Sequence, residues 1–167
     1  AGTLSPFALV REVREFFDGP IALSGSISEG SSVLSALALG ADFAYVGTKF
    51  IATEEANASP GYKQMIIDST ADDIMYSATF TGVNGNYLRP SVEAAGLNPE
   101  EHTSGSKDDM NFSTSAIAKK DNSSKAWKDI WGSGQGIGTI KDAPSVQTAV
   151  DQMVSEYEEA KSRLDNF

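Results

Sequence analysis

The hydrophobic pattern of the first 56 residues alternates between helical spacing and short apolar runs. Ser5 and Pro6 form an N-cap followed by proline at the first helical position, which predicts a helix start. Four apolar residues at helical spacing predict its buried stripe: Phe7, Val10, Val13 and Phe17. A second helix is predicted over residues 29–39, closed by Gly40. Its predicted inward face consists of Val33, Leu34, Leu37 and Ala38.

Two short apolar runs flank the second helix. Residues 21–23 are continuously apolar, as expected for a strand covered on both faces, and residues 43–46 form the next predicted strand. A strand, a helix and a strand within about 30 residues predict a right-handed βαβ unit with parallel strands. A helical run over residues 49–55 continues the alternation. The pattern therefore predicts an α/β fold for residues 1–56.

Residues 57–167 show no further βαβ pattern. Ser59 and Pro60 predict another helix start, while residues 74–80 are expected to be extended or irregular. Glycine and proline punctuate residues 82–90, which we interpret as a loop. This part of the chain is therefore expected to be a mixture of helices and loops.

The remaining elements are a short helix, a polar stretch and a closing helix. The short helix is expected over residues 91–95 and to stop at Gly96, and residues 98–124 are interpreted as a solvated polar excursion. Trp127 and Trp131 mark a short helix before a glycine-rich segment. The closing helix is predicted from the spacing of Val146, Ala149, Val150, Met153 and Tyr157.

Small and polar residues follow both predicted strands at their carboxyl ends. They are Ser24, Gly25 and Ser26 after the first strand, and Gly47 and Thr48 after the second. Ligands of parallel α/β folds bind at this edge, and glycine lets backbone N–H groups approach a phosphate. The Thr48 hydroxyl and the Lys49 charge would add to such a site. The pair of turns therefore favours phosphate binding; the alternative is that each is only a tight strand-to-helix connection.

The glycine-rich residues 134–138 superficially resemble a dinucleotide-binding loop. No clear strand precedes them, and too little chain follows for a Rossmann unit. We interpret the segment as a flexible loop near a site, with Gln135 as a polar contact.

Composition excludes several function classes. Thirteen Lys and Arg residues against twenty-three Asp and Glu residues give a net charge of −10, which argues against nucleic-acid binding and docking on anionic lipid. The chain has no cysteine and a single histidine, His102, which excludes disulfides, thiol catalysis and a multi-histidine metal site. The acidic doublets at residues 72–73 and 108–109 are interpreted as solvated, so no metal site is expected. No apolar run approaches the roughly 20 residues that span a bilayer.

Several segments resemble the nitronate monooxygenase family, formerly called 2-nitropropane dioxygenase. The string Gly47-Thr48-Lys49-Phe50-Ile51-Ala52-Thr53-Glu54-Glu55, preceded by Val46, carries the more specific part of this resemblance. The other similar segments are residues 21–26, 36–42, 73–77, 81–90, 125–131 and 134–136.

The resemblance implies an FMN-dependent oxidoreductase on a (β/α)8 barrel that oxidises alkyl nitronates with dioxygen. Residues 1–56 would be the last two strands of the barrel, and residues 57–167 a mostly helical extension packed on it. The FMN phosphate would be held by Ser24, Gly25, Ser26, Gly47 and Thr48. Gln135 would lie near the flavin or the substrate, and Met75 and Tyr76 would line the pocket.

The resemblance also implies a Gly-Gly-His-Ala-Gly segment before the first helix. Only Ala1 and Gly2 correspond to it, so the histidine that could act as a base is not in this sequence and no catalytic residue is assigned. The sequence also lacks an initiator Met, and we expect it to be the closing portion of a longer cytoplasmic protein. A homodimer is left open.

The sequence leaves two alternatives open. A flavin-dependent enoyl-acyl-carrier-protein reductase would share the barrel and the phosphate turns but use a nicotinamide donor. A non-catalytic phosphate-binding fragment would fold and bind its ligand without further sequence, which two parallel strands with open edges make difficult.

Overall fold

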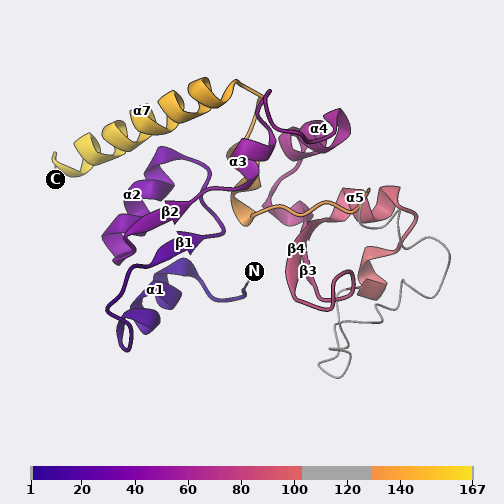
Figure 1. The fold of residues 1–167 in the computed structure, drawn as a ribbon, viewed down its shortest axis with the longest axis horizontal. Helices are drawn as coiled ribbons and strands as arrows, with labels where there is room; N and C mark the ends of the chain where they lie inside the picture. Colours follow the sequence, from indigo (N-terminus) through magenta and orange to yellow (C-terminus); the bar gives the residue numbers. More distant parts are fainter. Residues whose placement is uncertain (1, 103–128, 167) are drawn as a thin grey trace.

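The computed structural model describes residues 2–102 and 129–166. Its elements form an α/β arrangement with a long final helix lying across one side (Figure 1). The predicted helix at Trp127 and most of the polar excursion lie outside the described residues. Among the described residues, no helix combines the length and the apolar character needed to cross a membrane.

Helix α1 (Pro6–Arg14) begins as predicted, but fewer of its apolar side chains are buried than predicted. The Ser5 hydroxyl accepts a hydrogen bond from the backbone N–H of Phe7, which caps the first turn. Val10 is buried, but Phe7 is 68% exposed and Phe17 is exposed beyond the end of the helix. The expected four-residue buried stripe is therefore wrong, because only the Val10 face of the helix meets the neighbouring elements.

Strands β1 (Ala22–Ser24) and β2 (Phe43–Tyr45) form a parallel pair joined through helix α2 (Gly30–Leu39), as the βαβ prediction requires. Gly40 has a φ of +105° and closes α2. The expectation that the first strand is covered on both faces is wrong. Leu23 is buried, whereas Ala22 and Ser24 on the opposite face are exposed.

The inward face of α2 also differs from the prediction. Ala36 is fully enclosed, whereas Leu37 and Ala38 are exposed; Val33 and Leu34 are half-buried. One core gathers around Val10, Leu23 and Ala36, where α1 and α2 cover the Leu23 face of the strand pair.

After β2 the chain forms helices α3 (Thr48–Ile51) and α4 (Pro60–Asp68) and the 3-10 helix η1 (Ala71–Asp73). The Ser59 hydroxyl caps α4 by accepting from the backbone N–H of Tyr62, which confirms the predicted start. Asp73 of the acidic doublet accepts hydrogen bonds from Thr70 and caps η1.

An antiparallel hairpin follows, which the hydrophobic pattern did not predict. Strand β3 (Ile74–Ser77) pairs with β4 (Gly85–Leu88), so part of the predicted loop over residues 82–90 is a strand. Helix α5 (Arg89–Ala94) ends before Gly96, as predicted, and η2 (Pro99–His102) follows.

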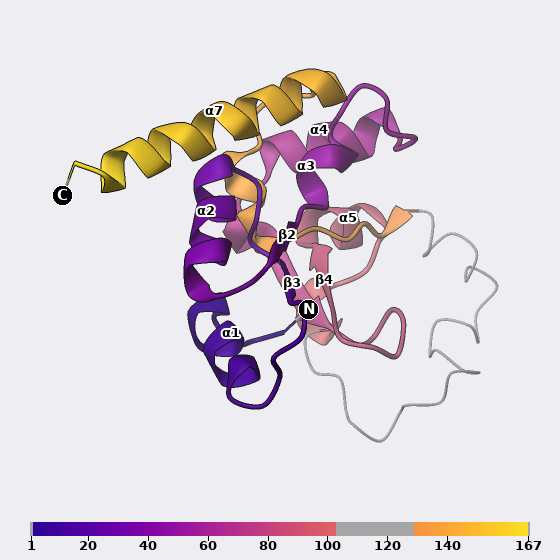
Figure 2. The same ribbon diagram turned by 60° about the vertical axis from the view of Figure 1, so that its left-hand side comes forward.

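The last described segment returns from the hairpin to the parallel strands (Figures 1 and 2). Gly132 forms a bridge to Tyr87 of β4, and η5 (Gln135–Thr139) then packs against η1, α3 and α4. Helix α7 (Val146–Leu164) packs along α2, and the N–H of Gly30 at the start of α2 donates to the Glu156 carboxylate. Ala149 and Ala160 of α7 are buried, while Val146 and Val150 of the predicted apolar spacing are partly exposed.

Candidate functional site

The ends of β1 and β2 lie side by side, because the parallel register pairs Ser24 with Tyr45. We call residues 24–26 the first turn, residues 47–48 the second turn and residues 133–139 the glycine segment. The glycine segment contacts both turns. These three segments carry all six residues that the sequence predicts for a cofactor site: Ser24, Gly25, Ser26, Gly47, Thr48 and Gln135.

Each turn contains a glycine whose side-chain direction is open. A Cβ atom built on Gly25 or on Gly47 would meet nothing within 4 Å. Gly25 has a φ of +130°, which L side chains rarely adopt, whereas the φ of Gly47 is an ordinary −113°. A ligand can therefore approach the backbone N–H groups of both turns without meeting a side chain there.

The two turns also carry three hydroxyl groups, those of Ser24, Ser26 and Thr48. Thr48 Oγ1 accepts a hydrogen bond from the backbone N–H of Gly134 over 2.8 Å and lies 3.4 Å from Ser133 Oγ. Within the described part of the chain, no hydrogen bond engages the side chain of Ser24 or Ser26. Backbone N–H groups together with free hydroxyls are a donor set that suits a phosphate group.

The glycine segment is a packed 3-10 helix rather than the flexible loop that we predicted. A Cβ on Gly134 would lie under 3.0 Å from the backbone oxygen of Gly25, and one on Gly136 would lie 2.7 Å from Ser28 Oγ. Glycine is therefore needed at both positions for close packing. The side chain of Gln135 is exposed, so a role for it as a polar contact stays a prediction.

Ser28 also belongs to this site, although no sequence motif predicted it. It is 3% exposed, and its Oγ donates to the backbone oxygen of Gly136 over 2.7 Å and lies 2.9 Å from Thr139 Oγ1. No local pattern marks a serine whose partner lies 108 residues away in the sequence. The one available signal was its position just after the first turn.

Arg14 lies at the other end of the strand pair, where it fixes the residues that precede β1 and β2. Its guanidinium donates to the backbone oxygens of Gly40 and Gly19 and pairs with the Asp42 carboxylate at 2.6 Å. The backbone N–H of Ile21 also donates to Asp42 over 2.8 Å. Two hydrogen bonds to the carboxylate lower the pKa of Asp42 below its ordinary value of 3.8. The larger effect comes from the N–H of Ile21 and the next from the Arg14 guanidinium.

An aromatic pair anchors the chain just before the glycine segment. The rings of Tyr62 and Trp131 stack with centroids 4.9 Å apart, and the Tyr62 hydroxyl donates to the backbone oxygen of Gly132. Burial raises the pKa of Tyr62 above its ordinary value of 10.0. Trp131 therefore packs against the core around Ile66 and Ile137, and Tyr62 fixes the entry to the glycine segment.

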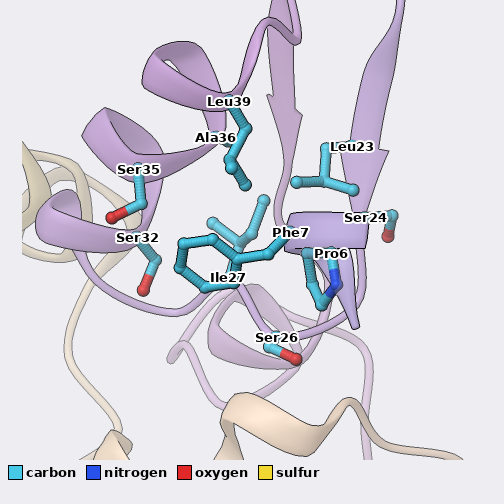
Figure 3. A pocket seen from close by; sticks show the side chains of 10 residues that line it. All are labelled: Pro6, Phe7, Leu23, Ser24, Ser26, Ile27, Ser32, Ser35, Ala36 and Leu39. Carbon is cyan, nitrogen blue, oxygen red and sulfur yellow. The ribbon is translucent and has the colours of Figure 1, made fainter. Parts of the chain in front are cut away.

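A cavity of about 190 Å³ adjoins the first turn, between α1, β1 and α2 (Figure 3). Ser24 and Ser26 contribute to its wall together with Leu23, and the exposed ring of Phe7 lies across it. Its lining is mostly apolar apart from serine hydroxyls. The first turn thus contains the open position at Gly25 and also forms part of the wall of a small, mostly apolar cavity.

Three further predicted contributors lie in other settings. Met75 is 2% exposed and packs in the core of the hairpin, and neither it nor Tyr76 lines the cavity of Figure 3. Lys49 is buried, and among the described acidic residues none forms an ion pair with it. A contribution of its charge to the turns stays a prediction.

Comparison with known proteins identifies related sequences. The family model described as nitronate monooxygenase matches residues 1–156. A nitronate monooxygenase of Paraburkholderia phytofirmans is 31% identical over 96 residues, which cover 58% of this chain and 26% of the relative. A probable nitronate monooxygenase of Staphylococcus aureus is 28% identical over 104 residues, or 59% of this chain and 28% of the relative.

Solved structures share the fold. FabK from Thermotoga maritima superposes with a TM-score of 0.71 at 24% identity, over 99% of this chain and 52% of its own. A nitroalkane oxidase from Streptomyces ansochromogenes has a TM-score of 0.71 at 24% identity, over 96% of this chain and 46% of its own. The chain thus corresponds to about half of each solved structure, and its matches span about a quarter of the curated relatives.

Proposed function

The chain belongs to the nitronate monooxygenase family, and on that premise we propose that it carries the phosphate-binding part of an FMN-dependent oxidoreductase. The substrates proposed for the full-length protein are alkyl nitronates and dioxygen. The observation that carries this proposal is the convergence of two strand-end turns with open glycine positions and free hydroxyls. Flavin, when bound, supplies a centre that accepts and donates electrons.

The proposed roles of the residues follow from their chemistry. The backbone N–H groups of the first and second turns would hold the phosphate, assisted by the hydroxyls of Ser24, Ser26 and Thr48. Thr48 accepts from Gly134, which leaves its own hydroxyl proton free to donate. Because the chain has a net charge of −10, binding of an anion must rest on these local donors rather than on the overall field.

We further propose that residues 1–56 form the last two strands and associated helices of a (β/α)8 barrel, with residues 57–167 packed on it. One face of the strand pair supports this. Phe43 is 60% and Tyr45 66% exposed, on the same face as Ala22, although parallel sheets are normally covered on both faces. In a closed barrel this face would be the interior surface. The remaining strands would enclose it and pair with the two open edges of the strand pair.

An enoyl reductase activity is the second candidate, because the enoyl reductase domain of MlnA from Bacillus amyloliquefaciens shares the fold with a TM-score of 0.59 at 18% identity. The two activities differ in their electron flow. A nitronate monooxygenase consumes dioxygen with a nitronate and needs no nicotinamide donor. An enoyl reductase oxidises a nicotinamide donor in the presence of an enoyl thioester.

The full-length protein provides the test. We expect it to purify with bound FMN, or to take up one FMN per chain on reconstitution, and to consume dioxygen with an alkyl nitronate. A protein that takes up no FMN would refute the proposed cofactor. Uptake of FMN with turnover of an enoyl thioester and no turnover of nitronate would favour the second candidate.

A further inference from the structure

Apart from Ser24, the residues of the two turns lie beyond the paired part of the sheet. The last paired residues are Ser24 and Tyr45, so strand hydrogen bonds do not set the spacing of the residues that follow them. The glycine segment is hydrogen-bonded to the Thr48 hydroxyl of the second turn and to the hydroxyl of Ser28, two residues after the first turn. We propose that Ser28 is a positioning residue that, together with Thr48, clamps the glycine segment onto the turns and so sets the geometry of the phosphate site. This proposal rests on the proposed function.

The first half of the clamp is the contact between Ser28 and the glycine segment. Ser28 Oγ is buried and donates to the backbone oxygen of Gly136 over 2.7 Å. Thr139 Oγ1 lies 2.9 Å from Ser28 Oγ and also donates to Gly136. A Cβ on Gly136 would lie 2.8 Å from the backbone oxygen of Ser26, so the backbones here are in close contact. Ser28 therefore holds the chain just after the first turn against the middle of the segment.

The second half of the clamp lies two residues earlier. The N–H of Gly134 donates to Thr48 Oγ1 over 2.8 Å, and the Cα of Gly134 packs against the backbone oxygen of Gly25. Gly134 caps η5, and Gly136 lies within it, so the two contacts belong to one short, regular piece of chain. Because that piece touches both turns, its length fixes the distance between them.

A fixed distance matters because the proposed ligand is held by backbone groups from two separate turns. Donors that are already in place cost less conformational entropy on binding than donors that must be ordered. Loss of the Ser28 hydroxyl would leave the second contact intact and loosen the first turn. The expected consequence is weaker binding of the phosphate group, with little change in contacts to the rest of the ligand.

The test compares FMN with riboflavin, which has the same ring but no phosphate. In the full-length protein, Ser28→Ala should weaken FMN binding by about five- to tenfold, the usual effect of one hydrogen bond, and leave riboflavin binding unchanged. Ser155→Ala is the matched control, because within the described residues the hydroxyl of this exposed serine on α7 is hydrogen-bonded to Glu159 alone. It should change neither affinity.

Each result decides between the alternatives. Equal weakening of FMN and riboflavin by Ser28→Ala, or no weakening of either, would overturn the positioning role. A wild-type protein that binds both ligands equally, or neither, would instead refute the proposed phosphate site. If Ser28→Ala does not fold, Thr139→Val removes the exposed hydroxyl of the same contact, and it should lower the ratio of FMN to riboflavin affinity by about two- to threefold. An unchanged ratio would then overturn the proposal.

Discussion

The backbone N–H of Gly134 donates a hydrogen bond to Thr48 Oγ1 over 2.8 Å, although 86 residues separate the two in the sequence. Thr48 begins the helix that follows β2, and Gly134 immediately precedes η5. This contact joins the return of the chain from the hairpin to the end of the parallel sheet. The proposed phosphate site therefore depends on residues from both halves of the chain.

Gly47 allows the proposed site to be blocked at little cost to the fold. Its φ is ordinary and a Cβ there meets nothing within 4 Å, so Gly47→Ala and Gly47→Leu should both fold with nearly unchanged thermal stability. If phosphate binds against this backbone, the leucine side chain should weaken FMN binding by about tenfold or more, equivalent to about 1.4 kcal/mol, and alanine by less. Fluorescence titration of flavin measures both. Equal affinity of Gly47→Leu and the wild type would place the phosphate elsewhere.

Gly134 should tolerate no side chain, in contrast to Gly138 of the same segment. A Cβ on Gly134 would press into the backbone of Gly25, whereas the nearest atoms to a Cβ on Gly138 are 3.9 Å away. We expect Gly134→Ala to lower the free energy of unfolding by about 1–3 kcal/mol, as overpacking does, and Gly138→Ala to leave it nearly unchanged. Denaturant titration of both variants makes the comparison. Similar values for the two would show that the close packing at Gly134 is absent.

Asp42 should contribute to stability in a pH-dependent way. Its lowered pKa means that the folded state binds the proton more weakly than the unfolded state, so the contribution is complete above pH 3.8 and is lost as the pH falls through the folded value below 3.8. Asp42→Asn should therefore be less stable than the wild type at neutral pH, and the difference should shrink below pH 3.8. Urea midpoints at neutral and acidic pH measure this. A difference that persists unchanged in acid would point to a cause other than the Asp42 charge.

Tyr62 should act at the opposite end of the pH scale. Its pKa is raised by burial, so above the unfolded value of 10.0 the unfolded state releases the proton first and stability falls as the pH rises through the folded value. Tyr62→Phe keeps the stacking on Trp131 and removes both this titration and the hydrogen bond to Gly132. The variant should be less stable at neutral pH and show a weaker loss of stability above pH 10.0. Parallel alkaline profiles would contradict the assignment.

The local features of the fold were predictable, whereas the packing of its faces was not. Ser5 and Ser59, each followed by proline, marked helix starts because a cap and its N–H groups are neighbours in the sequence. The parallel strand pair followed from βαβ spacing. Phe7 was wrongly placed in the core because periodicity shows that a face is apolar, not that a neighbour covers it. The strand at Gly85 was missed because its pairing with Ser77 lies outside any local pattern.

The two turns of the candidate site were predictable from the sequence, whereas the residues that hold them in place were not. Gly25 and Gly47 stood out because glycine after a buried strand has a specific backbone use. Ser28 did not stand out, because a buried serine is recognised only through its partner Gly136, which lies far along the chain. Composition also suggested flexibility for the glycine segment, yet glycine there permits close backbone packing.

A crystal structure of the full-length protein with FMN would test most directly whether the two turns together hold a flavin phosphate. We expect phosphate oxygens within hydrogen-bond distance of backbone N–H groups in both residues 24–26 and residues 47–48, with the Thr48 hydroxyl donating to one of them. A phosphate that contacts neither turn, or a flavin bound in another part of the protein, would contradict the proposed site.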